Sequence, residues 1–356
     1  MGRQDKVFGE LKKERNSNFE LLRIISMYMI VLIHANIYLG EFDGGTIAAR
    51  IYNGVVNGIC NTGVSLFILI SGYFGVSFNI KKLTRLECKM ITYSLIVMGL
   101  SLFIYGETMT SGDKLELLGK SLLPFASRNH WFYSCYVLIV LFSGFIEKLI
   151  GTMDKKSFGV FLGLMLFCFS VLPTCIYFEI MQDNGKGLVQ MFMIYMIGRY
   201  IRKYGSDFGR EHKKLIIGCF VATWIVNLIS FNNPIKVGGI YHTLCKDNST
   251  TNMILAVSLF YLFKDIKIRS KYINVVAYYM FAVFAMNYVL ISMTVDFIRD
   301  KLPMLTSLGE FGYLMIPAIA LLVLVVCVLV GVIRDFLLGC VDVVIAERVE
   351  RLFEVA

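Results

Sequence analysis

The chain has 356 residues, of which 57% are hydrophobic and only 17% are charged, and its mean hydropathy is +0.67. Soluble domains carry about 25% charged residues, so this composition excludes an ordinary soluble enzyme and indicates a polytopic integral membrane protein. The net charge of +9 does not indicate nucleic-acid binding, because the basic residues follow the loops between apolar segments, where they set membrane orientation.

Apolar runs recur along the chain, and a helix that crosses a bilayer needs about 20 such residues. The pattern predicts an all-α fold with about ten transmembrane helices. They are expected at about 19–40, 55–76, 88–106, 131–150, 158–178, 187–203, 214–231, 252–264, 274–297 and 310–333. With the N-terminus inside, the inner segments hold most of the 35 Lys and Arg residues, so both termini are predicted to be cytoplasmic.

The first apolar run carries three ionisable side chains, those of Glu20, Arg23 and His34. Charges within a spanning helix cost about 2.5–3.5 kcal/mol each, so such residues are functional candidates. Eleven residues at about 100° each place Arg23 and His34 on one face, about 16 Å apart along the axis, and Glu20 lies on the same stripe. These residues could simply bond to neighbouring helices. In a catalytic interpretation His34 removes a proton from an alcohol, and Arg23 holds a phosphate or orients Glu20.

The second run contains Ser71, Gly72 and Tyr73 and is followed by a basic loop. A Ser-Gly pair permits close helix approach or a local break, so packing alone can explain Gly72, while Ser71 and Tyr73 are candidates for substrate binding. The loop carries Lys81, Lys82 and Arg85. A basic cytoplasmic loop is also what the orientation rule requires; the functional alternative is capture of a polyphosphate donor by charged hydrogen bonds.

The fourth run begins with Asn129, His130, Trp131 and Tyr133 at the predicted outer surface. Trp and Tyr are enriched at membrane interfaces as anchors, which is the simpler interpretation. The same aromatic rings suit stacking on a sugar, and Asn129 or His130 suits binding of its hydroxyls. We therefore take these four residues as candidates for acceptor binding.

The last residues are too charged to span a membrane. The sequence from 335 to 356 mixes Phe, Leu and Val with Glu and Arg, which is typical of an interfacial amphipathic helix. The predicted organisation is thus a cytoplasmic arm at 1–18, a transmembrane domain at 19–334 and a cytoplasmic tail at 335–356.

Motifs of soluble enzymes are absent from the sequence. There is no nucleophile elbow, phosphate-binding loop, dinucleotide fingerprint or zinc-protease motif. The four histidines and nine cysteines are dispersed, and no CxxC occurs. No metal is expected, and the cysteines are expected to be reduced packing residues.

Four stretches together resemble the membrane-bound acyltransferase 3 family. They run in order between about residues 16 and 300 and comprise Glu20 to Met27 leading to His34, Gly63 to Tyr73, His130 to Tyr136, and Gly187 to Ile201. The arginine–ten–histidine spacing together with the Ser-Gly-Tyr segment makes the resemblance fairly specific.

The resemblance implies an O-acyltransferase of the bacterial inner or plasma membrane. Such enzymes take an acyl group, usually acetyl, from cytoplasmic acyl-CoA and deliver it to a hydroxyl of a cell-surface or lipid-linked glycan. Acetyl-CoA would be a co-substrate, and membrane lipids and polysaccharide-biosynthesis proteins would be partners. By motif, His34 corresponds to the essential histidine, Arg23 to its paired arginine, and Arg85, with Lys81 and Lys82, to the basic donor-binding cluster.

Two departures from the family pattern concern the acceptor chemistry. Many members have a histidine where Asn287 stands here, and the basic cluster is thinner than the double-arginine version. Whether His34 acts as a general base or relays the acyl group stays open at this stage. An exporter or flippase of the same fold, which moves the glycan without acyl transfer, is the alternative from another functional class.

Overall fold

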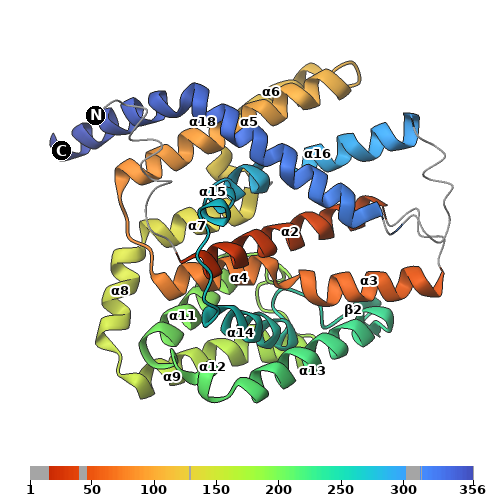
Figure 1. Cartoon of the computed structure of the whole chain (residues 1–356), viewed down its shortest axis with the longest axis vertical. Helices are drawn as coiled ribbons and strands as arrows, with labels where there is room; N and C mark the ends of the chain where they lie inside the picture. The colour runs from red at the N-terminus through yellow and green to blue at the C-terminus, as the bar shows by residue number, and fades with distance from the viewer. Residues whose placement is uncertain (1–15, 40–45, 128–129, 302–312, 314, 356) are drawn as a thin grey trace.

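The structure is a computed structural model that describes residues 16–39, 46–127, 130–301, 313 and 315–355. Helices make up most of this part of the chain and pack side by side (Figure 1). In chain order they are α2 (Ser17–Leu39), α3 (Ile47–Cys60), α4 (Thr62–Phe74), α5 (Ile80–Tyr105), α6 (Ser111–Leu122), α7 (Trp131–Leu141), α8 (Ser143–Thr152), α9 (Lys155–Leu166), α10 (Leu172–Cys175), α11 (Leu188–Tyr204), α12 (Phe208–Glu211), α13 (Lys213–Asn232), α14 (Thr250–Lys264), α15 (Lys271–Tyr278), α16 (Met280–Lys301) and α18 (Met315–Val355). A 3₁₀ turn, η2 (Pro124–Ala126), and a π-helical turn, η4 (Phe167–Val171), complete the helical elements.

The helical architecture predicted from the sequence is confirmed, with one small addition. Strands β1 (Ile235–Val237) and β2 (Ile240–His242) form an antiparallel hairpin between α13 and α14, in which Lys236 is opposite Tyr241. Gly238 and Gly239 form its turn with φ of 58° and 85°, a backbone conformation that favours glycine.

Seven helical stretches of the described chain are long and apolar enough to cross a membrane. Two of them join separate elements: Ile47–Phe74 joins α3 and α4, and Lys155–Cys175 joins α9, η4 and α10. An eighth span results if α7 and α8, bent by 60°, are counted as one. The chain is therefore a polytopic membrane protein. The spans predicted at 187–203 and 252–264 correspond to α11 and α14, which have 17 and 15 residues. Their lengths of about 22–26 Å fall short of the roughly 30 Å hydrocarbon core.

Several helices begin before the apolar runs that predicted them. The second span was predicted at 55–76, but α3 begins at Ile47, where the Thr46 hydroxyl accepts a hydrogen bond from the Ala49 N–H at 3.2 Å. The third was predicted at 88–106, but α5 begins at Ile80 and is capped by Asn79. Hydropathy marks only the part of a helix in the membrane, whereas a cap residue marks where the helix begins.

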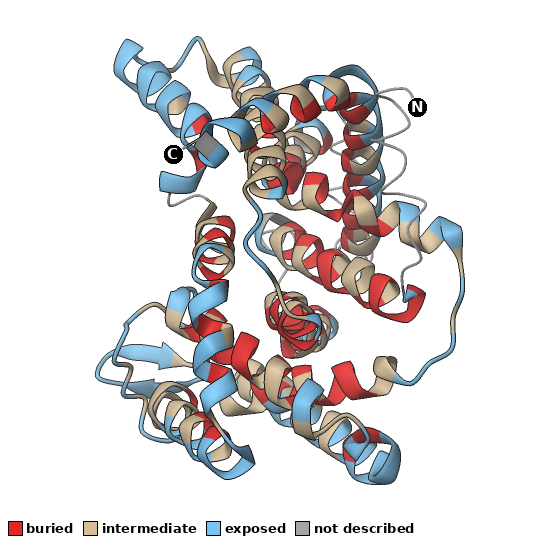
Figure 2. Cartoon of the chain, turned by 90° about the vertical axis from the view of Figure 1, so that its left-hand side faces the viewer, coloured by how far each residue is buried: buried red, intermediate tan, exposed pale blue. Residues whose placement is uncertain are grey.

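The middle of the bundle consists of α2, α4, α11 and α14. Helices α4 and α11 approach closely at two glycines: a Cβ on Gly72 would lie 2.2 Å from the Tyr195 carbonyl oxygen, and one on Gly198 would lie 2.5 Å from that of Leu69. The packing interpretation of Gly72 is confirmed. Figure 2 shows buried residues concentrated on the inner helices and exposed residues on the outlying ones. Many exposed side chains are large and apolar, as in Phe103 and Phe145, which suits a surface in lipid.

Helix α18 continues without a break through the predicted boundary between the transmembrane domain and the tail. Its 41 residues extend about 62 Å, twice the thickness of the hydrocarbon core. Immediately after the boundary it is held to α5 by buried charges. The Arg334 guanidinium donates to both Asp342 carboxylate oxygens and to the Thr92 hydroxyl, and Lys89 lies 2.8 Å from Asp335.

Candidate functional site

His34 lies in the last third of α2 and contacts α16. Its Nδ1 is 2.7 Å from the Asn287 Oδ1, and its ring meets that of Tyr288 edge to face with centroids 5.8 Å apart. Asn287 itself is only 2% exposed. Two helices far apart in the sequence thus hold the imidazole in one orientation.

The hydrogen bonds of Asn287 determine the tautomer of His34. The Asn287 amide nitrogen donates to the carbonyl oxygens of Val283 and Phe284, each at 2.9 Å. Carbonyl oxygens only accept, so the amide oxygen must be the atom that faces His34. Nδ1 therefore carries a hydrogen, and Nε2 keeps the lone pair. This is the form in which a histidine can accept a proton from a hydroxyl.

His34 lines a cavity of about 450 Å³, within the usual range of small-molecule pockets. The predicted residues His130 and Trp131 line the same cavity, although they come from the start of α7. Apolar walls are provided by Phe67, Phe132 and Phe284. The structure therefore places His34 and several aromatic rings around one cavity. Such a cavity suits a small polar ligand that can stack one face on an aromatic ring.

Several further polar residues of the cavity, including Lys120, were not predicted, and we single out Lys186 and Asp247. They come from the loops at 176–187 and 243–249, which precede α11 and α14. Burial raises the pKa of Asp247 to about 7, Lys186 opposes this shift and Asp183 adds to it. In the part of the chain that the structure describes, no hydrogen bond reaches the Asp247 carboxylate. Neither residue lies in an apolar run or a motif, so the sequence carried no signal for them.

Glu20 and Arg23 form an ion pair one turn apart on α2, with Arg23 Nη1 2.5 Å from Glu20 Oε1. The Glu20 side chain is 6% exposed and that of Arg23 is 23% exposed. Neither residue lines the His34 cavity. Arg23 is thus paired with Glu20, which matches one of the two roles predicted for it. It lies eleven residues before His34 on the same helix.

Three other predicted acceptor-binding residues, Ser71, Tyr73 and Tyr133, do not line the cavity. Ser71 donates to the Phe67 carbonyl of its own helix at 3.0 Å, and Tyr133 is buried and donates to Glu87. Tyr73 lies at the opposite end of the bundle from His34, where Arg202 Nη1 contacts its hydroxyl at 3.3 Å. Asn129 lies outside the described residues. The motif did not reveal that the side chains of Ser71, Tyr73 and Tyr133 point away from the cavity.

The predicted donor cluster is partly engaged with the end of α18. Lys81 Nζ is 2.9 Å from a Glu350 carboxylate oxygen and 3.8 Å from one of Glu347. Lys82 is exposed, and Arg85 is partly buried. The charge of Lys81 is therefore matched by two glutamates in this structure.

A metal-binding group of three or more His, Cys, Asp or Glu side chains does not occur among the described residues. All nine cysteines, each of which the structure describes, are free. The polar groups that line the cavity include two imidazoles, two ammonium groups, two amides, a carboxylate and several hydroxyls. They can exchange protons and bind hydroxyls.

A family model described as an acyltransferase domain matches residues 16–333. The match spans every element of the site, from Glu20 on α2 to Asn287 on α16. Comparison with curated proteins finds no match, and comparison with solved structures finds none either.

Proposed function

Because the chain belongs to the acyltransferase 3 family, as the match over residues 16–333 shows, we propose that it is an O-acyltransferase. It takes an acyl group, acetyl in our proposal, from cytoplasmic acyl-CoA and transfers it to a hydroxyl of a cell-surface or lipid-linked glycan. The observation that carries this proposal is the 2.7 Å contact of His34 Nδ1 with Asn287, which leaves Nε2 as the basic atom at the cavity.

In the proposed reaction His34 is the general base. Nε2 takes the proton of the sugar hydroxyl while the hydroxyl oxygen attacks the thioester carbonyl carbon. The carbon–sulfur bond then breaks, and the leaving CoA sulfur receives the proton from the imidazolium. General-base catalysis of this kind contributes about 10²–10⁴-fold. Asn287 keeps the same ring orientation before and after proton transfer, because Nδ1–H donates to it in both states.

The cavity supports a sugar acceptor by its chemistry. Trp131 offers a flat ring of the kind on which sugars stack, and Lys186 and Asp247 can donate to and accept from neighbouring hydroxyls. These three residues line the same space as His34. Binding on both sides of the reacting hydroxyl would hold it near Nε2, which is how enzymes convert binding into rate.

We further propose that both termini face the cytoplasm of a bacterium and that α11 and α14 complete the number of spans to ten. The distribution of Lys and Arg supports this orientation. Under it, the His34 cavity opens outward, where a surface glycan is found. The short length of α11 and α14 does not oppose a spanning role, because both pack against longer spans: α11 against Ile47–Phe74 and Lys155–Cys175, and α14 against α13.

The activity can be tested with the purified protein in lipid nanodiscs. Acetyl-CoA and a candidate acceptor oligosaccharide are supplied, and free thiol and acylated sugar are measured. We expect transfer by the natural protein and a loss of at least about 100-fold in His34→Ala, with thermal unfolding unchanged. An exporter would release no thiol, and near-normal transfer by His34→Ala would remove His34 from the mechanism.

A further inference from the structure

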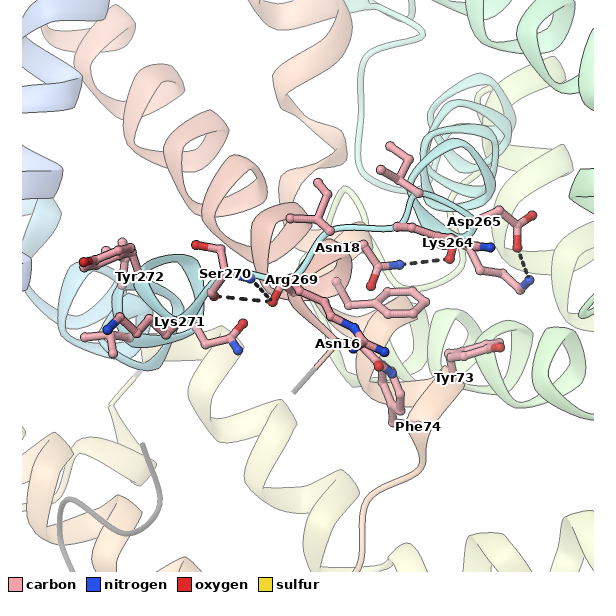
Figure 3. A pocket seen from close by; sticks show the side chains of 18 of the residues that line it. Asn16, Asn18, Tyr73, Phe74, Lys264, Asp265, Arg269, Ser270, Lys271 and Tyr272 are labelled. Atoms are coloured by element: carbon pink, nitrogen blue, oxygen red, sulfur yellow. Dashed lines mark hydrogen bonds and ion pairs between the residues drawn. The ribbon is translucent and has the colours of Figure 1, made fainter. Parts of the chain in front are cut away.

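A second hollow lies at the opposite end of α2 from His34, and it is larger than the cavity described above. It has a volume of about 2270 Å³ and is lined by the first residues of α2, the last residues of α4, and the connector between α14 and α15. Figure 3 shows Lys271 and Tyr272 on one side of it, Tyr73 and Lys264 on the other, and Arg269 extending between them. We call it the connector groove.

Basic side chains dominate the connector groove. Among the described residues that line it, Asp265 is the one acidic side chain, whereas six are basic: Arg202, Arg210, Lys264, Lys267, Arg269 and Lys271. Asp265 is already shared by Lys264 at 2.9 Å and Arg210 at 3.7 Å. In the described part of the chain, no carboxylate lies within ion-pair distance of Lys267, Arg269 or Lys271. Within the described residues, the groove thus holds more positive charge than its one carboxylate can neutralise.

The groove also offers groups that recognise more than charge. The Asn274 Oδ1 is buried at its wall and has no hydrogen-bond partner among the described residues, which is costly unless a ligand donor reaches it. Tyr272, which is 73% exposed, presents a ring beside Lys271. A base with an amino group and several phosphates would satisfy these groups together.

We propose that the connector groove binds the 3′-phosphorylated adenosine diphosphate of the acyl-CoA donor. Lys267, Arg269 and Lys271 hold its phosphates, and the Lys81–Arg85 cluster predicted from the sequence does not. This inference rests on the proposed function for the identity of the donor. What the inference adds is the docking site of the nucleotide. Arg269 supplies a planar fork that matches phosphate oxygens, and the two lysines supply point charges.

The position of the groove along α2 agrees with this assignment. Phe19 lines the groove, and His34 lies fifteen residues further along the same helix, about 22 Å along its axis. The Glu20–Arg23 pair lies between them. The nucleotide is therefore bound at one end of the helix that carries the candidate base at the other.

The test measures CoA binding by titration calorimetry on the full-length protein in phosphatidylcholine nanodiscs. We expect Lys267→Gln/Arg269→Gln to raise the Kd for CoA at least about tenfold, since a charged hydrogen bond contributes this much. The matched control is Lys213→Gln/Lys214→Gln, which removes two exposed charges at the start of α13, outside the groove. We expect its Kd to stay within about twofold. Comparison with 3′-dephospho-CoA should show weaker binding to the natural protein and a smaller penalty in the groove variant.

Each of three outcomes would overturn the inference. The groove variant could bind CoA normally; Lys81→Gln/Lys82→Gln could raise the Kd instead; or the groove variant could lose only retained phosphatidylglycerol, measured by native mass spectrometry, which would assign the groove to lipid headgroups. The proposed function fails separately. If CoA binds in the groove but no acyl transfer occurs, the docking site stands without the enzyme activity.

Discussion

Asn287 occupies a position where many family members have a histidine, and its amide performs a defined task for His34. It accepts from Nδ1 at 2.7 Å while its nitrogen is held by two carbonyls of α16. A residue that seemed a departure from the family pattern is thus the group that selects the tautomer.

We therefore expect Asn287→Leu to lower kcat at least about tenfold without changing the acceptor KM greatly, because the imidazole loses the acceptor that fixes its tautomer. Asn287→Asp should retain more activity, since a carboxylate also accepts from Nδ1. Steady-state kinetics of both variants, with circular dichroism as a check of folding, would show this. Equal rates for Asn287→Leu and the natural protein would mean that the tautomer is fixed elsewhere.

Asp247 predicts a pH dependence of stability. Its folded-state pKa of about 7 is raised above the ordinary value of 3.8, so between about pH 4 and 7 the folded state binds more protons than the unfolded state. The contribution of Asp247 to the free energy of unfolding therefore falls as pH rises to 7 and is constant above it.

Melting temperatures in detergent at pH 5 and pH 8 would measure this effect. We expect the melting temperatures of Asp247→Asn at pH 5 and pH 8 to differ less than those of the natural protein. The melting temperature of the variant should exceed that of the natural protein most at pH 8. Asp113→Asn, at an exposed acid, is the control. It should change the melting temperature by the same amount at pH 5 and at pH 8. An unchanged pH profile for Asp247→Asn would mean that this carboxylate is ionised in the fold.

At the scale of elements, the contact between α4 and α11 is limited by backbone atoms. A methyl group on Gly72 would lie 2.2 Å from the Tyr195 carbonyl oxygen, so the two helices would have to separate. We expect Gly72→Ala to lower the free energy of unfolding by about 1–3 kcal/mol, as overpacking does.

Gly99 on α5 is the matched control, because a methyl group there would meet nothing within 4 Å. We expect Gly99→Ala to be neutral or to stabilise by up to about 1 kcal/mol through helix propensity. Chemical unfolding of both variants in mixed micelles would compare them. Equal destabilisation by the two substitutions would contradict the close approach of α4 and α11.

At the scale of the whole molecule, the orientation in the membrane decides which cavity meets the glycan. Cys175 is the exposed cysteine among nine, all of which the structure describes, and it precedes the loop that supplies Lys186 to the His34 cavity. We expect a membrane-impermeant maleimide added to intact cells or spheroplasts to label this residue. Cys175→Ser should lose the label. Labelling only of inverted vesicles would reverse the proposed orientation.

The sequence predicted those parts of the molecule that depend on local pattern. Apolar runs predicted most of the long helices, and the Ser71–Gly72 pair was compatible with a close helix contact or a local break, of which the structure shows the contact. His130 and Trp131 lie in the cavity of His34, but Tyr133, only two residues on, points to Glu87, because helix rotation separates neighbours. Lys186 and Asp247 reach the cavity only through the packing of α11 and α14, which no local pattern encodes. Where α18 continues past the predicted boundary, Arg334 pairs with Asp342 of the same helix, but its contact with Thr92 of α5 is a tertiary one that no local pattern encodes.

The aromatic cluster around Phe19 has a consequence for the path of the proposed donor. Its ring lies 5.5 Å from that of Tyr73, 5.0 Å from that of Phe74 and 5.5 Å from that of Phe260, measured between centroids, and Leu22 one turn further is fully buried. Phe19, Tyr73 and Phe74 of this layer line the connector groove. The acyl arm of a donor whose nucleotide lies in the groove would therefore pass beside these rings on its way along α2 to His34.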